Sequence, residues 1–132
     1  MTTINILPGL YGIYKFHDLS AALDRVRVLE LGTKGFWALS HSPTETSLIC
    51  IEGKVETQYA DRQESWIGMY FDGQLDFALV GVLSRLTSVL ANAGLGVLAI
   101  STFDTDYVFV PSSKFSLASQ AIEANGYTLV SD

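Results

Sequence analysis

The sequence predicts an α+β protein in which strands and helices alternate, and the second half of the chain carries the evidence. The segment SWIGMYF at residues 65–71 is rich in aromatic and β-branched side chains and ends in Asp72-Gly73, which indicates a strand closed by a turn. A helix with one apolar face is indicated next by leucines at spacings of four, three and four: Leu79, Leu83, Leu86 and Leu90.

The elements after this helix follow in order. Gly94 ends the helix, because a left-handed residue is favoured there. GVLAISTF at residues 96–103 and DYVFVP at residues 106–111 predict two strands joined by a tight connection. A serine at 112 or 113 can cap a second helix that runs to Gly126, and YTLV predicts a last strand. Two right-handed strand-helix-strand crossovers then predict a ferredoxin-like βαββαβ sandwich with both helices on one face.

The first half of the chain echoes the second. It contains ALS, a polar interruption and SLICI, as the second half contains AIS, a polar interruption and YVFV. YGIYKF predicts the opening strand of this unit, and HDLSAALDRVRVLEL a short or imperfect helix. Ser42-Pro43-Thr44-Glu45 fits a helix capping box. The polar segment 53–64 is interpreted as the junction, so the predicted units are residues 1–62, partly degenerate, and residues 63–132.

Composition narrows the class of partner. The formal net charge is −6 and the basic residues are scattered singly, whereas phosphate backbones bind clustered positive charge, so nucleic acid is not an expected partner.

The single cysteine, Cys50, lies in the apolar run SLICIE and indicates a buried thiol in a reducing compartment. Residues 86–103 carry no charge and have the minimum length of a membrane-spanning helix. Their polar residues and the helix-ending sequence Asn-Ala-Gly indicate instead a helix followed by a strand. We therefore expect a cytoplasmic protein without a membrane partner.

Residues for catalysis are scarce. The chain has two histidines, His17 after a strand-like run and His41 in a polar turn, and both are interpreted as solvated. No nucleophile with a base and no set of metal ligands is evident, so we expect neither an enzyme nor a cofactor or metal.

The polar stretch STFDTD, residues 101–106, interrupts two apolar strands and leaves two interpretations open. Asp, Ser and Thr favour tight turns, so the stretch is explained by a hairpin alone. The same side chains also offer directional groups to a small zwitterion, with a ligand ammonium on an aspartate and a ligand carboxylate on backbone N–H groups near a helix start.

Residues 73–110 resemble the characteristic segment of ACT-domain proteins, specifically the compact tandem-ACT group related to the C-terminal regulatory domains of aspartokinases and to the CASTOR arginine sensors. LPGLYGIYKF and FWALSHSPTETSLICIEG resemble a first, partly degenerate ACT unit. The resemblance implies the βαββαβ fold and the binding of an amino acid at an interface between ACT units.

The resemblance also implies a set of ligand-binding residues. The strand-to-helix turn would meet the ligand with its main chain, two residues at the start of the next strand would line the opposite wall, and an aspartate in the hairpin would pair with a ligand cation. The predicted set is Leu79, Val80, Gly81, Val82, Gly96, Val97, Thr102, Phe103 and Asp106. Leu79 and Gly96 depart from an arginine-sensing pattern and favour a smaller or apolar amino acid.

The sequence thus predicts a non-catalytic regulatory protein that binds a small molecule, expected to be an amino acid. A homodimer with continued sheets is expected, because the exposed edges of ferredoxin-like units invite pairing. The alternative function is a protein-protein interaction module whose ACT-like pocket is closed.

Overall fold

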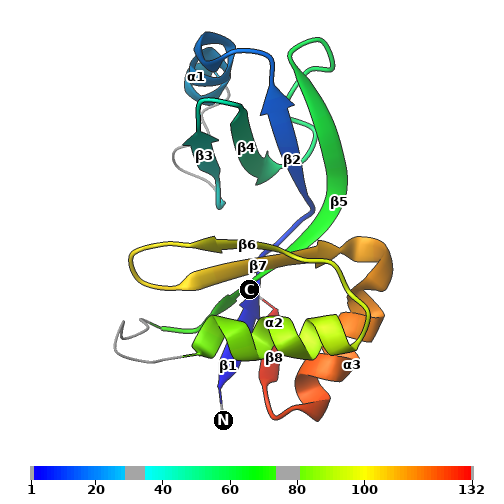
Figure 1. Ribbon diagram of the computed structural model, residues 1–132. Coiled ribbons are helices and arrows are strands. Elements are labelled where there is room, and N and C mark those ends of the chain that lie inside the picture. The colour runs from blue at the N-terminus through cyan, green and yellow to red at the C-terminus, as the bar shows by residue number, and fades with distance from the viewer. Residues whose placement is uncertain (1, 29–34, 74–80, 132) are drawn as a thin grey trace. The chain divides into compact units, whose positions relative to one another are not determined.

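The computed structural model describes residues 2–28, 35–73 and 81–131, and the chain forms two compact units (Figure 1). The N-terminal unit comprises Gly9–Ser65, and the C-terminal unit comprises Met1–Pro8 with Trp66–Asp132. The sequence predicts two ACT-like repeats, residues 1–62 and residues 63–132, and this boundary between repeats stays a prediction. It differs from the compact units in two respects, because residues 1–8 pack with the second half of the chain and the boundary lies between Ser65 and Trp66.

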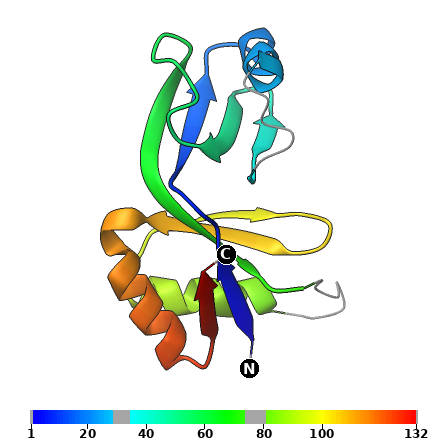
Figure 2. The ribbon, with the colours of Figure 1, turned by 180° about the vertical axis from the view of Figure 1, so that it is seen from behind.

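The C-terminal unit contains five strands and two α-helices among its described residues. The strand order is β6-β7-β5-β1-β8. All neighbours are antiparallel except β1 and β8, which are parallel and lie side by side in Figure 2. The elements are β1 (Thr3–Ile6), β5 (Ala60–Phe71), α2 (Val82–Asn92), β6 (Leu98–Ser101), β7 (Asp106–Pro111), a 3-10 turn η2 (Ser112–Lys114), α3 (Phe115–Ala124) and β8 (Thr128–Ser131).

This order confirms the α+β, ferredoxin-like fold predicted for residues 65–131, with one strand added. In a simple βαββαβ unit the last strand pairs directly with the first. Here β1, from the start of the chain, lies between β5 and β8 and pairs with both. Sequence analysis did not predict β1.

The core of the C-terminal unit lies between its sheet and its helices. The leucine stripe of α2 is confirmed for Leu86 and Leu90, which are buried, whereas Leu79 lies outside the described residues. These leucines pack against buried sheet residues such as Met69 and Val108. Gly94, at φ 82°, follows the helix as predicted, and the chain turns back because Leu95 N–H donates to the Leu90 carbonyl at 3.1 Å.

Among its described residues, the N-terminal unit has the ferredoxin-like topology without an added strand and with one helix fewer than the C-terminal unit. Its strand order is β3-β4-β2-β5, which is the order of a ferredoxin-like unit, and the first part of β5 serves as its last strand. The elements before β5 are β2 (Tyr11–Phe16), α1 (Leu19–Val28), β3 (Ala38–His41) and β4 (Thr46–Ile51).

A loop, residues 52–59, takes the place of the second helix in the N-terminal unit, and two arginines hold it. Arg25 of α1 contacts Glu56 at 3.0 Å and lies over the Tyr59 ring at 4.7 Å. Arg62 of β5 donates to the Val55 carbonyl at 2.8 Å. No helix therefore forms between β4 and β5, and the interpretation of this half as a partly degenerate ACT-like unit stays a prediction.

Two predictions in the N-terminal unit were wrong. Ser42-Pro43-Thr44-Glu45 is not a helix start but the turn between β3 and β4, in which Ser42 Oγ accepts hydrogen bonds from the Thr44 and Glu45 N–H groups. The β-branched and apolar residues that follow continue as a strand, so no helix forms there. Residues 60–64, assigned to a polar junction, form the start of β5.

None of the described helices has the length and apolar character needed to cross a membrane. The uncharged span 86–103 is the end of α2, a turn and β6, as the sequence predicted.

Close packing around Gly68 leads to a first prediction. Gly68 pairs with Phe109 across β5 and β7, and an added Cβ would lie 2.6 Å from the Phe109 ring and 2.7 Å from Leu7. Both neighbours are buried, so we expect Gly68→Ala to lower the free energy of unfolding by about 1–3 kcal/mol. Urea unfolding measures this. Gly96→Ala is the control, because no atom lies within 4 Å of its added Cβ, and an equal loss in both variants would contradict the packing argument.

Two buried groups in the N-terminal unit, the Cys50 thiol and the Tyr14 hydroxyl, predict that the protein loses stability at alkaline pH. Burial, followed by the nearby Glu64 charge, raises the pKa of Cys50 from 9.0 to about 12, and burial with the hydrogen bond to Glu64 raises that of Tyr14. Between pH 9 and 12 the unfolded thiol has lost its proton while the folded thiol keeps it, so rising pH favours unfolding.

We expect the free energy of unfolding to fall across this range, with Cys50 contributing up to about 4 kcal/mol. Cys50→Ala should flatten the fall, measured by urea unfolding at several pH values. A slope as steep in Cys50→Ala as in the wild type would show that the thiol is not responsible.

Candidate functional site

The predicted ligand-binding residues of the strand-to-helix turn are placed only in part. Leu79 and Val80 lie outside the described residues. Gly81 is the N-cap of α2, at φ 80°, and its carbonyl accepts the Arg85 N–H at 2.8 Å. No side chain caps this helix end within the described part of the chain, and an added Cβ at Gly81 would meet open space. Val82 is half-buried and packs on the core. Gly81, at the start of the helix, is exposed.

The polar hairpin between β6 and β7 satisfies many of its own hydrogen bonds. Ser101 Oγ donates to Asp106 Oδ1 at 2.5 Å. Thr102 N–H and Thr102 Oγ both donate to the Thr105 carbonyl, at 2.8 and 3.0 Å. The composition of STFDTD is thus explained in large part by the turn, and Asp106 has a hydroxyl partner from its own hairpin.

The structure brings some of the predicted residues to one end of the sheet and places others at the opposite end. Thr105 Oγ donates to the Phe71 carbonyl at 3.2 Å, so the hairpin lies beside the end of β5 from which the chain continues toward α2. Gly96 and Val97 precede β6 and therefore lie at its other end from Thr102. Gly96 is exposed, and Val97 is half-buried against the core.

Phe103 lies at the tip of the hairpin and is 80% exposed. At this exposure its side chain contributes little to the core of the unit.

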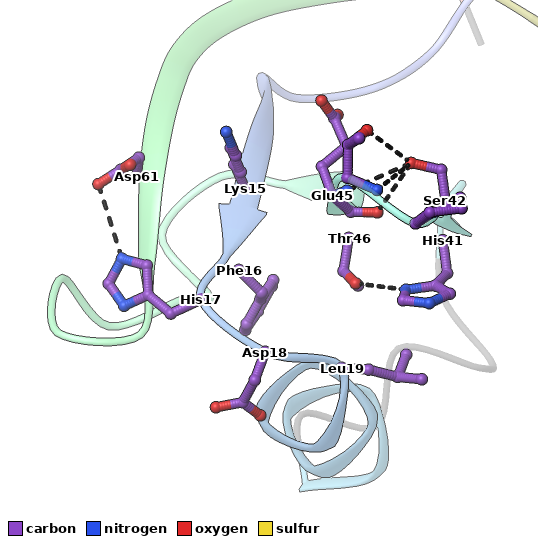
Figure 3. Close-up of a pocket in the computed structure, with 12 residues that line it drawn as sticks. Lys15, Phe16, His17, Asp18, Leu19, His41, Ser42, Glu45, Thr46 and Asp61 are labelled. Carbon is purple, nitrogen blue, oxygen red and sulfur yellow. Dashed lines mark hydrogen bonds and ion pairs between the residues drawn. The ribbon is translucent and has the colours of Figure 1, made fainter.

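The N-terminal unit contains a cleft at the topologically equivalent place. Figure 3 shows it at the end of β2, beside the start of α1 and the turn between β3 and β4. Its volume is about 370 Å³, which lies at the small end of the range for ligand pockets. It is lined by Lys15, Phe16, His17, Asp18, Leu19, His41, Ser42, Pro43, Thr44, Glu45, Thr46 and Asp61.

Two aspartates of this cleft are held by their neighbours. Asp18 is the N-terminal cap of α1, because its Oδ1 accepts the Ala21 N–H at 2.7 Å. Asp61 of β5 lies 3.7 Å from His17 Nε2, and both side chains are largely exposed. The start of α1 therefore carries the negative charge of Asp18, whereas none of the described side chains caps the start of α2.

The turn between β3 and β4 forms another wall of the cleft. His41 Nδ1 lies 2.7 Å from Oγ of Thr46, which is buried and fixes the ring. Glu45 Oε1 accepts the Ser47 hydroxyl at 2.8 Å. These bonds give the wall a fixed arrangement of polar groups.

The cleft is lined by both acidic and basic side chains. Such groups form charge-assisted hydrogen bonds with partners of the opposite sign. Among the described residues, no group of three or more His, Cys, Asp or Glu side chains is placed to hold a metal ion.

Sequence analysis missed this cleft because each histidine was interpreted alone as solvated. The signal that points to it is the repeat between the two halves of the chain. Aligning the two polar hairpins places His17 and Asp18 at the strand-to-helix turn of the first unit, as Gly81 is in the second.

Comparison with known proteins identifies the second half of the chain. Residues 61–124 match the family model of the ACT domain. The protein carries an ACT domain. All nine predicted ligand-binding residues lie within the matched ACT segment, whereas the cleft of the N-terminal unit lies outside it except for Asp61. No curated protein sequence matches the chain.

Solved structures share the fold over almost the whole chain, beyond the ACT segment. A protein from Agrobacterium tumefaciens is 21% identical, with a TM-score of 0.83 over 99% of this chain and 93% of its own. A Vibrio cholerae protein of unknown function, described as a possible transport protein, is 20% identical, with a TM-score of 0.70 over 93% and 88%.

The ligand-free regulatory subunit of aspartate kinase from Thermus thermophilus is 12% identical, with a TM-score of 0.64 over 89% of this chain and 93% of that one. The fold is therefore that of aspartate kinase regulatory domains, which confirms the resemblance found in the sequence.

The capping role of Asp18 gives a third prediction. Asp18→Ala removes the acceptor of the Ala21 N–H and should lower the free energy of unfolding by about 0.5–2 kcal/mol. Asp18→Asn keeps a capping oxygen and should lose much less. Urea unfolding of the two variants tests this, and equal losses would show that the charge, rather than the cap, stabilises the helix.

Proposed function

We propose that the protein is a non-catalytic regulatory protein that binds a small ligand, an amino acid, at its ACT domain. The fold and the ACT match support a regulatory role, since the similar structures include an aspartate kinase regulatory subunit. Of the sequence-predicted set, the described residues proposed for the ligand site are Gly81, Val82, Thr102, Phe103 and Asp106, because Gly96 and Val97 lie at the other end of β6.

The open start of α2 carries this proposal. Gly81 provides the left-handed backbone and no side chain, so N–H groups of the first helical turn are accessible to a ligand carboxylate. The positive end of the helix dipole adds to this attraction.

Asp106 is the proposed partner of the ligand ammonium. It is half-buried at the start of β7 and accepts one hydrogen bond from Ser101, and a carboxylate has the capacity to accept more. The hairpin and the end of β5 lie together, which favours a site built from this end of the sheet.

We also propose how ligand binding is transmitted and in what oligomeric state. The two ACT-like repeats, residues 1–62 and 63–132, would transmit ligand binding through the association of units in a cytoplasmic homodimer. Exposed edge strands such as β6 and β8 offer backbone groups for this association.

A second candidate function, a protein-protein interaction module, is favoured by one observation. Phe103 projects from a hairpin whose polar groups are largely bonded to one another, as an anchor for a partner protein would.

A thermal-shift screen against the twenty amino acids tests the ligand site. A ligand at one hundred times its dissociation constant stabilises the protein by about 2.7 kcal/mol, which should raise the melting temperature by about 10 °C. Asp106→Ala should abolish the shift, because the ligand ammonium loses its partner.

Two variants at Gly81 sharpen the test. Gly81→Asp places a carboxylate at the helix start and should repel the ligand carboxylate, whereas Gly81→Asn has the same size and tolerance of positive φ without the charge. Binding lost in the Asp variant and retained in the Asn variant supports the site. A screen without any shift on folded wild-type protein would reject ligand sensing and favour the interaction module.

A further inference from the structure

The chain passes between the two compact units at two places, from Pro8 to Gly9 and from Ser65 to Trp66. The residue on the N-terminal unit's side of each connection has a left-handed backbone, with φ 82° at Gly9 and φ 67° at Ser65. Among the described residues, Ser65 is the only one other than glycine with a positive φ. A serine keeps this conformation only where its surroundings hold it, so the neighbours of Ser65 determine the path of the chain here.

Ser65 lies where β5 exchanges one neighbouring strand for another. The first part of β5 lies beside β2 in the N-terminal unit, and from Trp66 onward β5 pairs with β7. A backbone N–H at such a change of neighbours has to find its hydrogen-bond partner outside the regular ladder. That partner is Glu52, whose Oε1 accepts the Ser65 N–H at 2.8 Å. The carboxylate charge strengthens this bond.

Glu52 is also bonded beside the other connection. It follows β4, and its own N–H donates to the carbonyl of Leu10, the residue after Gly9, at 2.9 Å. Gly9 packs on the preceding residue, because an added Cβ there would lie 2.7 Å from Ile51 Cδ1. Glu52 is half-buried, whereas Leu10 and Ser65 are exposed. One residue is therefore bonded next to both connections, through its main chain at the first and through its side chain at the second.

We propose that Glu52 restrains the two connections and thereby limits the motion of the units relative to each other. Units joined by exposed connections move by default, and a residue bonded beside both connections opposes this. Without the carboxylate, Ser65 is free to relax to the negative φ that residues other than glycine favour. This inference involves no ligand and stands apart from the proposed function.

Amide hydrogen exchange measured by NMR tests the hydrogen bond. Glu52→Ala removes the acceptor, so exchange of the Ser65 amide should become about five- to tenfold faster. Glu52→Gln keeps an acceptor oxygen and should retain much of the protection. Glu45→Ala is the matched control, because it removes another side-chain hydrogen bond of 2.8 Å in the same unit, from the Ser47 hydroxyl. It should leave exchange at Ser65 unchanged.

Pulsed electron-electron double resonance tests the consequence for the units. Spin labels at Ser20→Cys in α1 and Ser116→Cys in α3 place one label on an exposed position of each unit. Cys50→Ala removes the native thiol from this parent protein. The distribution of distances between the labels should be broader in Glu52→Ala than in the parent, and Glu45→Ala should leave its width unchanged.

Two variants at Ser65 test the same restraint through the backbone. Ser65→Val disfavours a positive φ because valine is β-branched, so it should broaden the distance distribution even though Glu52 is present. Ser65→Gly accepts the left-handed conformation and keeps the N–H, so it should leave the distribution as narrow as in the parent.

Two outcomes would overturn the proposal. Exchange at Ser65 that is unaffected by Glu52→Ala would show that the carboxylate does not hold this amide in solution. Faster exchange with an unchanged distance distribution would show that the bond orders only its own turn. Circular dichroism confirms that each variant is folded, and Ser65→Val gives the decision on the distance distribution if Glu52→Ala does not fold.

Discussion

The backbone of β5 is the constraint on which both units depend. This strand of twelve residues pairs with β7 from Trp66 to Tyr70 and with β1 from Met69 to Phe71, and its first part lies beside β2. Unpaired backbone groups in a protein interior cost free energy, so each of these strands is held in place by the groups that β5 offers. The parallel strand β8 then depends on β1, which is the neighbour with which it pairs.

The two halves of β5 differ in composition because they occupy different places in their sheets. In the N-terminal unit β5 ends the strand order, and an edge strand tolerates the charged residues Asp61, Arg62 and Glu64. In the C-terminal unit it is central, and its residues after Ser65 are apolar or glycine. Ser65 itself has φ 67°, and its N–H is held by Glu52 at 2.8 Å. A sequence pattern that changes within one strand is easily interpreted as a boundary between two elements.

Sequence reasoning succeeded where local pattern and tertiary position agree. The strand 106–111 and the strand 11–16 have the predicted bounds, and the predicted glycine, Gly94, follows the end of the helix of the leucine stripe at Asn92. It missed β1 because a strand of four residues, TINI, has little pattern of its own and is defined by partners more than sixty positions away. It assigned a helix cap to Ser42 because the same side-chain bond to a nearby N–H forms in a helix start and in a tight turn.

The two candidate sites were predictable to different degrees, because one lies in a continuous segment and the other is assembled from distant segments. The residues around α2 belong to one continuous segment and were found through a resemblance that covers it. The cleft is assembled from β2, α1, the turn before β4 and the start of β5, and none of these segments carries a binding motif alone. His17 and Asp61 are 44 positions apart and meet only because β5 returns beside β2.

The two helix starts differ in their cap residues. An unoccupied helix N-terminus attracts anions through its N–H groups and its dipole, and an aspartate at the cap satisfies those N–H groups and reverses the attraction. Asp18 places α1 in the second condition, whereas among the described residues no side chain caps α2. Because Asp18 and Gly81 occupy the same place in the shared topology, one fold carries a carboxylate cap in one unit and a glycine in the other. The charge at such a helix start therefore depends on the cap residue rather than on the fold.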